Sequence, residues 1–296
     1  MLFLLLAILL NAYLSVSFKV FPRWKIDTLQ AIVFNYCTCV VTGSVFLGYF
    51  PIGAESVQQG WFPWALLMGS LFVSIFNLMG YVTIKESVAI STIANKLSLV
   101  IPVLFAVWLY GEPLNALKIA GILLAVPAVW LSVRSQRGLP ARAGYFWPLL
   151  LFFGSGFLDT LVNFVTQKYF AAGATELQSG QAAYLVHSFA AAATIGLLLL
   201  TVLWATGKKQ FAWRHVLAGI IIGIPNYFSI YYLIRLLNSG FMDTSAAIPV
   251  VNIGIVLTAS VAAIIFFGES TSKQRLAGIA LSIIAILMIA FSGLSR

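Results

Sequence analysis

The stretch AISTIANKLSLVIPVLFAVWLYGEPLNALKIAG, residues 89–121, decides the fold, because it returns in altered form at residues 246–278 as AAIPVVNIGIVLTASVAAIIFFGESTSKQRLAG. Each copy is a long apolar run, a Gly-Glu turn and a second apolar run. One fixed shift of 157 positions matches Asn95 with Asn252, Gly111-Glu112 with Gly268-Glu269, and Gly121 with Gly278. The chain is therefore predicted to consist of two related halves, residues 1–138 and 139–296.

The composition places the chain in a membrane. Hydrophobic residues make up 61% of the sequence and charged residues 8%, against about a quarter charged in soluble domains. A helix needs about 20 apolar residues to cross the hydrocarbon layer. Ten such segments fill the chain, at residues 2–21, 28–49, 62–83, 88–110, 114–133, 145–170, 178–206, 214–237, 244–267 and 273–293. The sequence thus predicts an all-α integral membrane protein and leaves no length for a soluble catalytic or nucleic-acid-binding domain.

The net charge of +9 is interpreted as a topology signal, since basic loops set the orientation of membrane proteins. Basic residues gather in alternate connections, among them Lys19, Lys208 and Arg214. The opposite side holds only Lys118, Lys168, Arg235 and Arg296. Counting positive charges therefore places the first set of connections in the cytoplasm and both termini outside.

Polar side chains form stripes along several apolar segments. Asn11, Ser15 and Lys19 are spaced by four in the first segment, which places them on one helical face. Asp159 and Asn163 begin a stripe of the same spacing in the sixth segment, and further stripes contain Asn77 and Asn226. Lipid cannot satisfy such groups, so they indicate either hydrogen bonds between helices or a shared polar cavity. The number of stripes favours the cavity.

Two charges lie far from the segment ends. Lys96 is near the ninth residue of segment 88–110, and Asp159 is near the fifteenth of segment 145–170. An isolated charge at such a depth costs at least ~2.5 kcal/mol, and an intramembrane ionisable residue is a functional-site hypothesis. Two interpretations stay open: the residues pair and hold two helices together, or Lys96 meets an anionic group of a solute while Asp159 meets a cationic group or carries a proton.

Proline and Gly-Glu positions add structural expectations. Pro102 and Pro249 lie inside apolar segments, where each removes a backbone donor and frees the carbonyl four residues back, at Ser98 and Ser245. We expect helix kinks there. Glu112 and Glu269, which follow Gly111 and Gly268, are predicted to cap the helices at 114–133 and 273–293, because a carboxylate stabilises the first turn of a helix.

The two Gly-Glu copies, LFAVWLYGEPLNALKIAG and AAIIFFGESTSKQRLAG, resemble the EamA domain of the drug/metabolite transporter superfamily. The resemblance covers the whole chain as two copies. It implies a ten-helix secondary transporter with inverted five-helix repeats, in which the first, third, fourth, sixth, eighth and ninth segments surround a central path. Ser270 stands where the first copy has Pro113, a mild departure from the pattern.

The resemblance also implies substrates and a site. Members of the superfamily move amino acids, nucleobases, nucleotide sugars, quaternary amines and drugs, commonly by proton coupling or exchange. Carried to this sequence, the cavity lining would be Asn11, Asn77, Asn95, Lys96, Asp159, Asn163, Asn226 and Asn252. Lys96 is not part of the general pattern and is therefore a candidate substrate determinant. Related ten-span proteins usually have cytoplasmic termini, which is opposite to the orientation that the charge count favours.

These observations predict a multi-pass transporter of the cell (inner) membrane, a monomer or homodimer, that exports or exchanges an amino-acid-like zwitterion or anion. A lipid-carrier flippase and a multidrug or cation exporter are the alternatives. Asp159 and Asp243 resemble a paired-aspartate protease motif, but neither follows a Gly-x-Gly and Asp243 lies at a segment end, so an enzyme is not expected. The sequence has no phosphate-binding loop, zinc motif or other sign of a cofactor or metal. Its expected partners are a small-molecule substrate and the lipid bilayer, with no nucleic acid.

Overall fold

The computed structural model describes residues 1–111, 115–134, 143–170, 175–237, 239, 244–269 and 272–294. Within these residues the regular structure is helical, and no strand occurs. The elements are α1 (Leu2–Val20), η1 (Phe21–Trp24), α2 (Thr28–Leu47), η2 (Ala54–Gln58), α3 (Phe62–Lys85), α4 (Val88–Leu97), α5 (Val100–Tyr110), α6 (Ala116–Arg134), α7 (Ala143–Phe170), α8 (Thr175–Ala205), α9 (Trp213–Leu237), α10 (Thr244–Phe267) and α11 (Lys273–Leu294).

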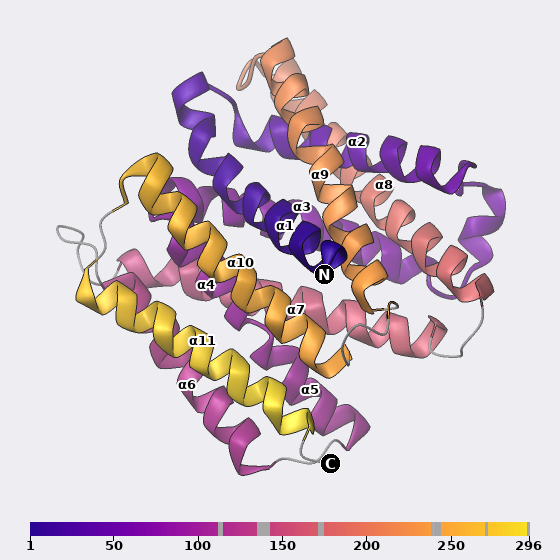
Figure 1. Ribbon diagram of the computed structural model, residues 1–296. Coiled ribbons are helices and arrows are strands. Elements are labelled where there is room, and N and C mark those ends of the chain that lie inside the picture. Colours follow the sequence, from indigo (N-terminus) through magenta and orange to yellow (C-terminus); the bar gives the residue numbers. More distant parts are fainter. Residues whose placement is uncertain are drawn as a thin grey trace. The chain divides into compact units, whose positions relative to one another are not determined.

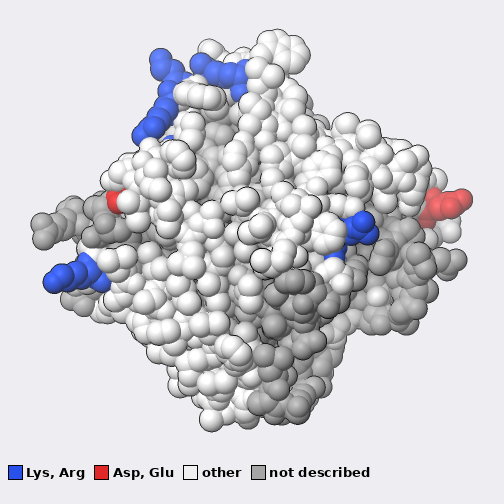
Figure 2. All heavy atoms as spheres, viewed as in Figure 1, with Lys and Arg blue, Asp and Glu red and all other residues white. Residues whose placement is uncertain are grey.

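The prediction of a helical multi-span membrane protein is confirmed. In the described part of the chain, eight helical stretches are long and apolar enough to cross a membrane, and α4 and α5 together form one of them. Two shorter apolar stretches, Ala116–Ala125 in α6 and Leu276–Ser292 in α11, account for the other two predicted segments. On the face that Figure 2 shows, the described residues are mostly uncharged, and Lys and Arg lie in a few places.

Local sequence determines where several helices begin and end. Asp27 accepts a hydrogen bond from the Gln30 amide and so caps α2, and Ser87 caps α4 by the same contact with Ile90. Gly111 and Gly268 follow the last residues of α5 and α10, with φ of 66° and 62°. This left-handed conformation is strained for residues with a Cβ, and glycine adopts it without cost. The matched glycines of the two copies therefore end their helices in the same way.

The chain forms two compact units, whose helices are labelled in Figure 1. The first unit comprises Met1–Val20, Leu78–Phe157 and Phe228–Arg296. In this unit α6 packs closely along α11 at Gly121. A Cβ added at this glycine would lie only 2.9 Å from the Ala285 carbonyl oxygen. Helix α1 packs along α10, where Gly254 accommodates the side chain of Ile8.

The second unit comprises Phe21–Asn77 and Leu158–Tyr227. Its core surrounds Tyr36, which is fully buried and donates a hydrogen bond to the Phe72 carbonyl at 2.8 Å. The Tyr36 ring stacks with the rings of Phe72 and Phe189. Helices α3 and α8 touch at Gly69, where a Cβ would lie 2.5 Å from the Cβ of Ala191.

Each compact unit takes segments from both predicted halves of the chain. The units are therefore a different division from the repeats at residues 1–138 and 139–296. The boundary between the repeats falls at residues outside the described part of the chain, and the repeat arrangement stays a prediction.

Candidate functional site

The fourth predicted segment is interrupted near its middle. Helix α4 ends at Leu97 and α5 begins at Val100, with Ser98 and Leu99 in a tight right-handed turn. Pro102 cannot donate to the Ser98 carbonyl, and that carbonyl accepts from the Ile101 amide at 2.9 Å instead. The backbone at the break is thus satisfied by a shorter turn. The span thus tightens from an α-helix to a 3₁₀-type turn at its middle, and such a turn inside a helix often marks a functional hinge.

Asn95 and Lys96 lie in the last turn of α4, directly before this break. The Asn95 Nδ2 donates to the Ser155 Oγ on α7 at 2.9 Å. Gly156, the next residue of α7, permits this approach, since a Cβ there would lie 2.3 to 2.8 Å from side-chain atoms of Ile101 on α5. The two halves of the broken span are therefore both held by α7 in the first unit, with the half-buried Lys96 beside the contact.

The other predicted site residues of the first unit are Asn11 and Asn252. The Asn11 Nδ2 donates to the Ala7 carbonyl of its own helix at 3.0 Å, so α1 itself satisfies part of this amide. Asn252 is partly buried on α10, two residues before the Gly254 contact with α1.

The second unit contains four predicted site residues: Asn77, Asp159, Asn163 and Asn226. Asp159 is partly buried on α7, and Asn163 is exposed one turn later. Asn77 donates to the Val73 carbonyl of its own helix at 2.8 Å. The chain thus divides the two deep charges, with Lys96 in the first unit and Asp159 in the second. Their direct pairing stays a prediction.

Asn226 lies in a packed contact between α9 and α2. It is 4% exposed, and its Nδ2 lies 3.1 Å from the Asn35 Oδ1 and 3.6 Å from the Cys39 Sγ. Gly223 brings the helices together, since a Cβ there would lie 2.8 Å from the Asn35 carbonyl oxygen. Of the two interpretations of the polar stripes, this contact favours the hydrogen bond between helices for Asn226. Its amide group is buried and donates to Asn35 within the same unit.

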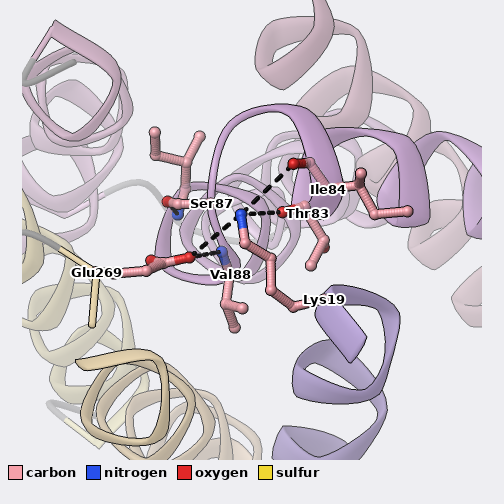
Figure 3. Close-up of polar contacts among 7 residues, drawn as sticks. Lys19, Thr83, Ile84, Ser87, Val88 and Glu269 are labelled. Atoms are coloured by element: carbon pink, nitrogen blue, oxygen red, sulfur yellow. Dashed lines mark hydrogen bonds and ion pairs between the residues drawn. The ribbon is translucent and has the colours of Figure 1, made fainter. Parts of the chain in front are cut away.

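Glu269 occupies a charged cluster that joins three parts of the first unit (Figure 3). Its Oε1 lies 3.6 Å from the Lys19 Nζ at the end of α1 and accepts from the Val88 amide at 3.0 Å. The Lys19 Nζ also donates to the Thr83 carbonyl at 3.1 Å. Glu269 therefore caps α4, a helix that the sequence did not suggest as its partner. Glu112, its predicted counterpart, lies outside the described residues.

Sequence reasoning missed the contact of Ser155 with Asn95 and the ion pair of Lys19 with Glu269. Lys19 ends a polar stripe, a signal that already set it apart from the apolar residues around it. No local signal identifies Ser155 as the partner of Asn95 or Glu269 as the partner of Lys19, because each pair is formed by residues far apart in the chain.

Glu86 stands in the turn between α3 and α4, next to this cluster. Burial raises the pKa of its carboxyl, and the nearby Lys19 charge opposes the shift. The folded state therefore holds its proton to higher pH than the unfolded state, and the stability that this proton gives is lost as pH rises through the folded pKa.

We expect Glu86→Gln to remove this loss. The free energy of unfolding of the parent should decline more steeply than that of the variant as pH rises above the ordinary glutamate range. Detergent-solubilised protein unfolded with SDS at a series of pH values measures the difference. Parallel pH profiles for the two proteins would contradict the expected shift.

The comparisons with known proteins bear on the fold alone. No protein-family model matches the chain. The chain is similar to an uncharacterized protein of Haemophilus influenzae, with 28% identity over 290 residues, covering 96% of this chain and 95% of the relative. The chain is also similar to a protein of known crystal structure, with a TM-score of 0.62 and 17% sequence identity. The match covers 98% of this chain and 97% of the other chain. At that identity the likeness establishes a shared fold, and residue roles follow from the geometry above.

Proposed function

We propose that this protein is a secondary transporter that exports or exchanges a small polar metabolite by alternating access. The observation that carries the proposal is the interrupted span α4–α5, with Asn95 and Lys96 directly before the break. Irregular backbone at membrane depth is tolerated where it is buried in protein or lines a cavity, and transporter sites make use of such interruptions. A lysine at this depth is costly and marks such a site.

The charges of the proposed site favour an amino-acid-like zwitterion or an anion. Lys96 supplies a cation for a carboxylate or similar group. Asp159 supplies a carboxylate that binds an amine or exchanges a proton. Neither requires a cofactor, and an ion gradient is the energy source that we propose.

Membership of the EamA-domain family of the drug/metabolite transporter superfamily is part of the proposal. It is supported by the matched left-handed glycines, Gly111 and Gly268. It is also supported by a helix contact that recurs with its residue types exchanged: Ile8 of α1 meets Gly254 of α10, and Gly156 of α7 meets Ile101 of α5. A recurring contact between these helix pairs is expected when α1 and α7, and likewise α10 and the α4–α5 span, are equivalent in inverted repeats.

The inner membrane of the cell is the proposed location. The protein acts there as a monomer or homodimer. Positive-inside counting favours external termini.

Counterflow into proteoliposomes tests the proposal. Vesicles containing the purified protein would be preloaded with one of a panel of amino acids, organic anions, nucleobases and quaternary amines, and uptake of the labelled compound measured. We expect one zwitterion or anion to accumulate. Lys96→Ala should reduce its initial rate at least tenfold, since a hydrogen bond to a charged group is worth about 1.5–3 kcal/mol.

Variants at both charges separate the roles. Lys96→Arg should retain more activity than Lys96→Ala because it keeps the charge, and Asp159→Asn should abolish any dependence of uptake on a pH gradient. Lys85→Ala, at an exposed position, is the control and should transport normally. Uptake of a quaternary amine that is indifferent to Lys96→Ala would support a cation exporter instead, and no uptake of any compound would move the assignment towards a lipid-carrier flippase.

A further inference from the structure

A basic pocket opens between the N-terminal ends of α2 and α9, in the second unit. Its volume is about 490 Å³. The residues that line it include Lys25, Asp27, Lys208, Lys209, Arg214 and His215. Figure 2 shows Lys and Arg side chains gathered at the top of the view, where Figure 1 places the connection between α8 and α9.

Direct contacts between the two helix ends give this pocket its shape. The Asp27 amide donates to the His215 Nδ1 at 3.1 Å, and the Gln30 Nε2 donates to the Gln210 carbonyl at 3.1 Å. Lys25 has a φ of 52°, which is uncommon for a residue with a Cβ and costs about 1 kcal/mol. Its amide is fixed by a hydrogen bond to the Pro22 carbonyl. The walls of the pocket are therefore held together by the fold.

The charges of the pocket are strongly unbalanced. Four cationic side chains face one carboxylate, Asp27. Asp27 is already engaged, since it pairs with Lys209 and accepts from the Gln30 amide. Within the described part of the chain, Lys25, Lys208 and Arg214 form no ion pair. The positive ends of two helix dipoles add to this field, so the pocket is suited to an anion.

The uncharged groups supply a further donor and acceptor. His215 is 4% exposed, and because its Nδ1 accepts from the Asp27 amide, the neutral ring carries its hydrogen on Nε2. Gln30, 1% exposed, has a buried Oε1 for which the described residues provide no donor. Both residues lie in the wall of the pocket.

Exposed aromatic residues beside the pocket support a position near the lipid headgroups. Trp24 and Trp213 directly precede Lys25 and Arg214 in the chain, and they are 66% and 73% exposed. Tryptophan is enriched at the membrane–water interface. Basic pockets between membrane helices at that level bind anionic headgroups.

From the convergence of these cations on one pocket at headgroup level, we propose that it binds the phosphate group of an anionic phospholipid. Arg214, Lys208 and Lys25 hold the phosphate oxygens, and the two tryptophans lie among the headgroups. This function is separate from transport of a solute and would couple the second unit to the lipid composition.

Native mass spectrometry of the full-length protein, released from detergent with phosphatidylglycerol or phosphatidylcholine, tests the proposal. We expect at least one phosphatidylglycerol to bind more tightly than phosphatidylcholine. The variant Lys208→Gln/Arg214→Gln should weaken phosphatidylglycerol binding at least about tenfold, since each cation near the surface contributes to headgroup attraction. The matched control Lys85→Gln/Lys273→Gln removes the same charge from exposed positions outside the pocket and should change the affinity less than twofold.

Two results would overturn the proposal. An equal loss in the control variant would mean that the attraction is a property of overall charge. Competition by millimolar glycerol 3-phosphate or inorganic phosphate, with no added affinity for the lipid, would assign the pocket to a soluble phosphorylated ligand. Should the double variant fail to fold, Arg214→Gln alone with the same two lipids makes the comparison, and unchanged preference would again overturn the proposal.

Discussion

Replacing Glu269 with alanine should lower the free energy of unfolding by about 3 kcal/mol, near the lower end of what is lost when one partner of a buried ion pair is removed. The Glu269 side chain is 8% exposed, and its partner Lys19 is 22% exposed. The substitution leaves the Lys19 charge partly buried and removes the acceptor of the Val88 amide at the start of α4. Both losses act at the junction of α1, α4 and α10.

Companion variants separate these two losses. Glu269→Gln keeps an oxygen that can accept from the Val88 amide and removes only the charge, so it should cost less than Glu269→Ala. Adding Lys19→Met to Glu269→Ala should cost less than the sum of the single changes, because no unpaired charge is left behind. SDS titration in mixed micelles measures the free energy of unfolding of the parent, of the three single variants and of the double variant. Additive losses would mean that Lys19 and Glu269 do not stabilise one another.

Gly69→Val should be at least as disruptive, with an expected loss of about 3 kcal/mol, the upper end for overpacking. A Cβ at this position would lie 2.5 Å from the Ala191 Cβ and 2.7 Å from the Ala192 backbone nitrogen. A backbone atom cannot rotate out of the way as a side chain can. Helix α3 therefore has to move away from α8, at the expense of the packing around Tyr36.

A matched change and a partial rescue test the steric explanation. Leu66→Val introduces the same side chain at an exposed position of α3, 48% accessible, and should cost little. Gly69→Ala combined with Ala191→Gly removes the closest clash and should be more stable than Gly69→Ala alone, while the contact with the Ala192 nitrogen keeps it below the parent. Tryptophan fluorescence during thermal unfolding gives the order of stabilities. Equal effects of Leu66→Val and Gly69→Val would contradict the close helix contact.

The sequence predicted which residues of the candidate site are unusual better than it predicted which residues they contact. Pro102 placed an irregularity at Ser98, and the helix is interrupted there because proline cannot form the regular hydrogen bond. Asn226 was identified as a polar group in an apolar helix, but its contact with Asn35 depends on how α2 and α9 pack. Asn11 and Asn77 each donate one hydrogen bond within their own helices, and the common cavity that the polar stripes suggested stays a prediction.

What the sequence by itself determined is the class of fold. Runs of about 20 apolar residues, glycine turns and charges at segment ends are local properties, and the lipid phase requires such runs to be helical. Only the tertiary structure decided that Glu269 caps α4, that Lys25 and Arg214 share one pocket, and that each compact unit combines both halves of the chain. These depend on which helix faces meet, and a helical pattern gives the face of a residue without naming the helix that will cover it.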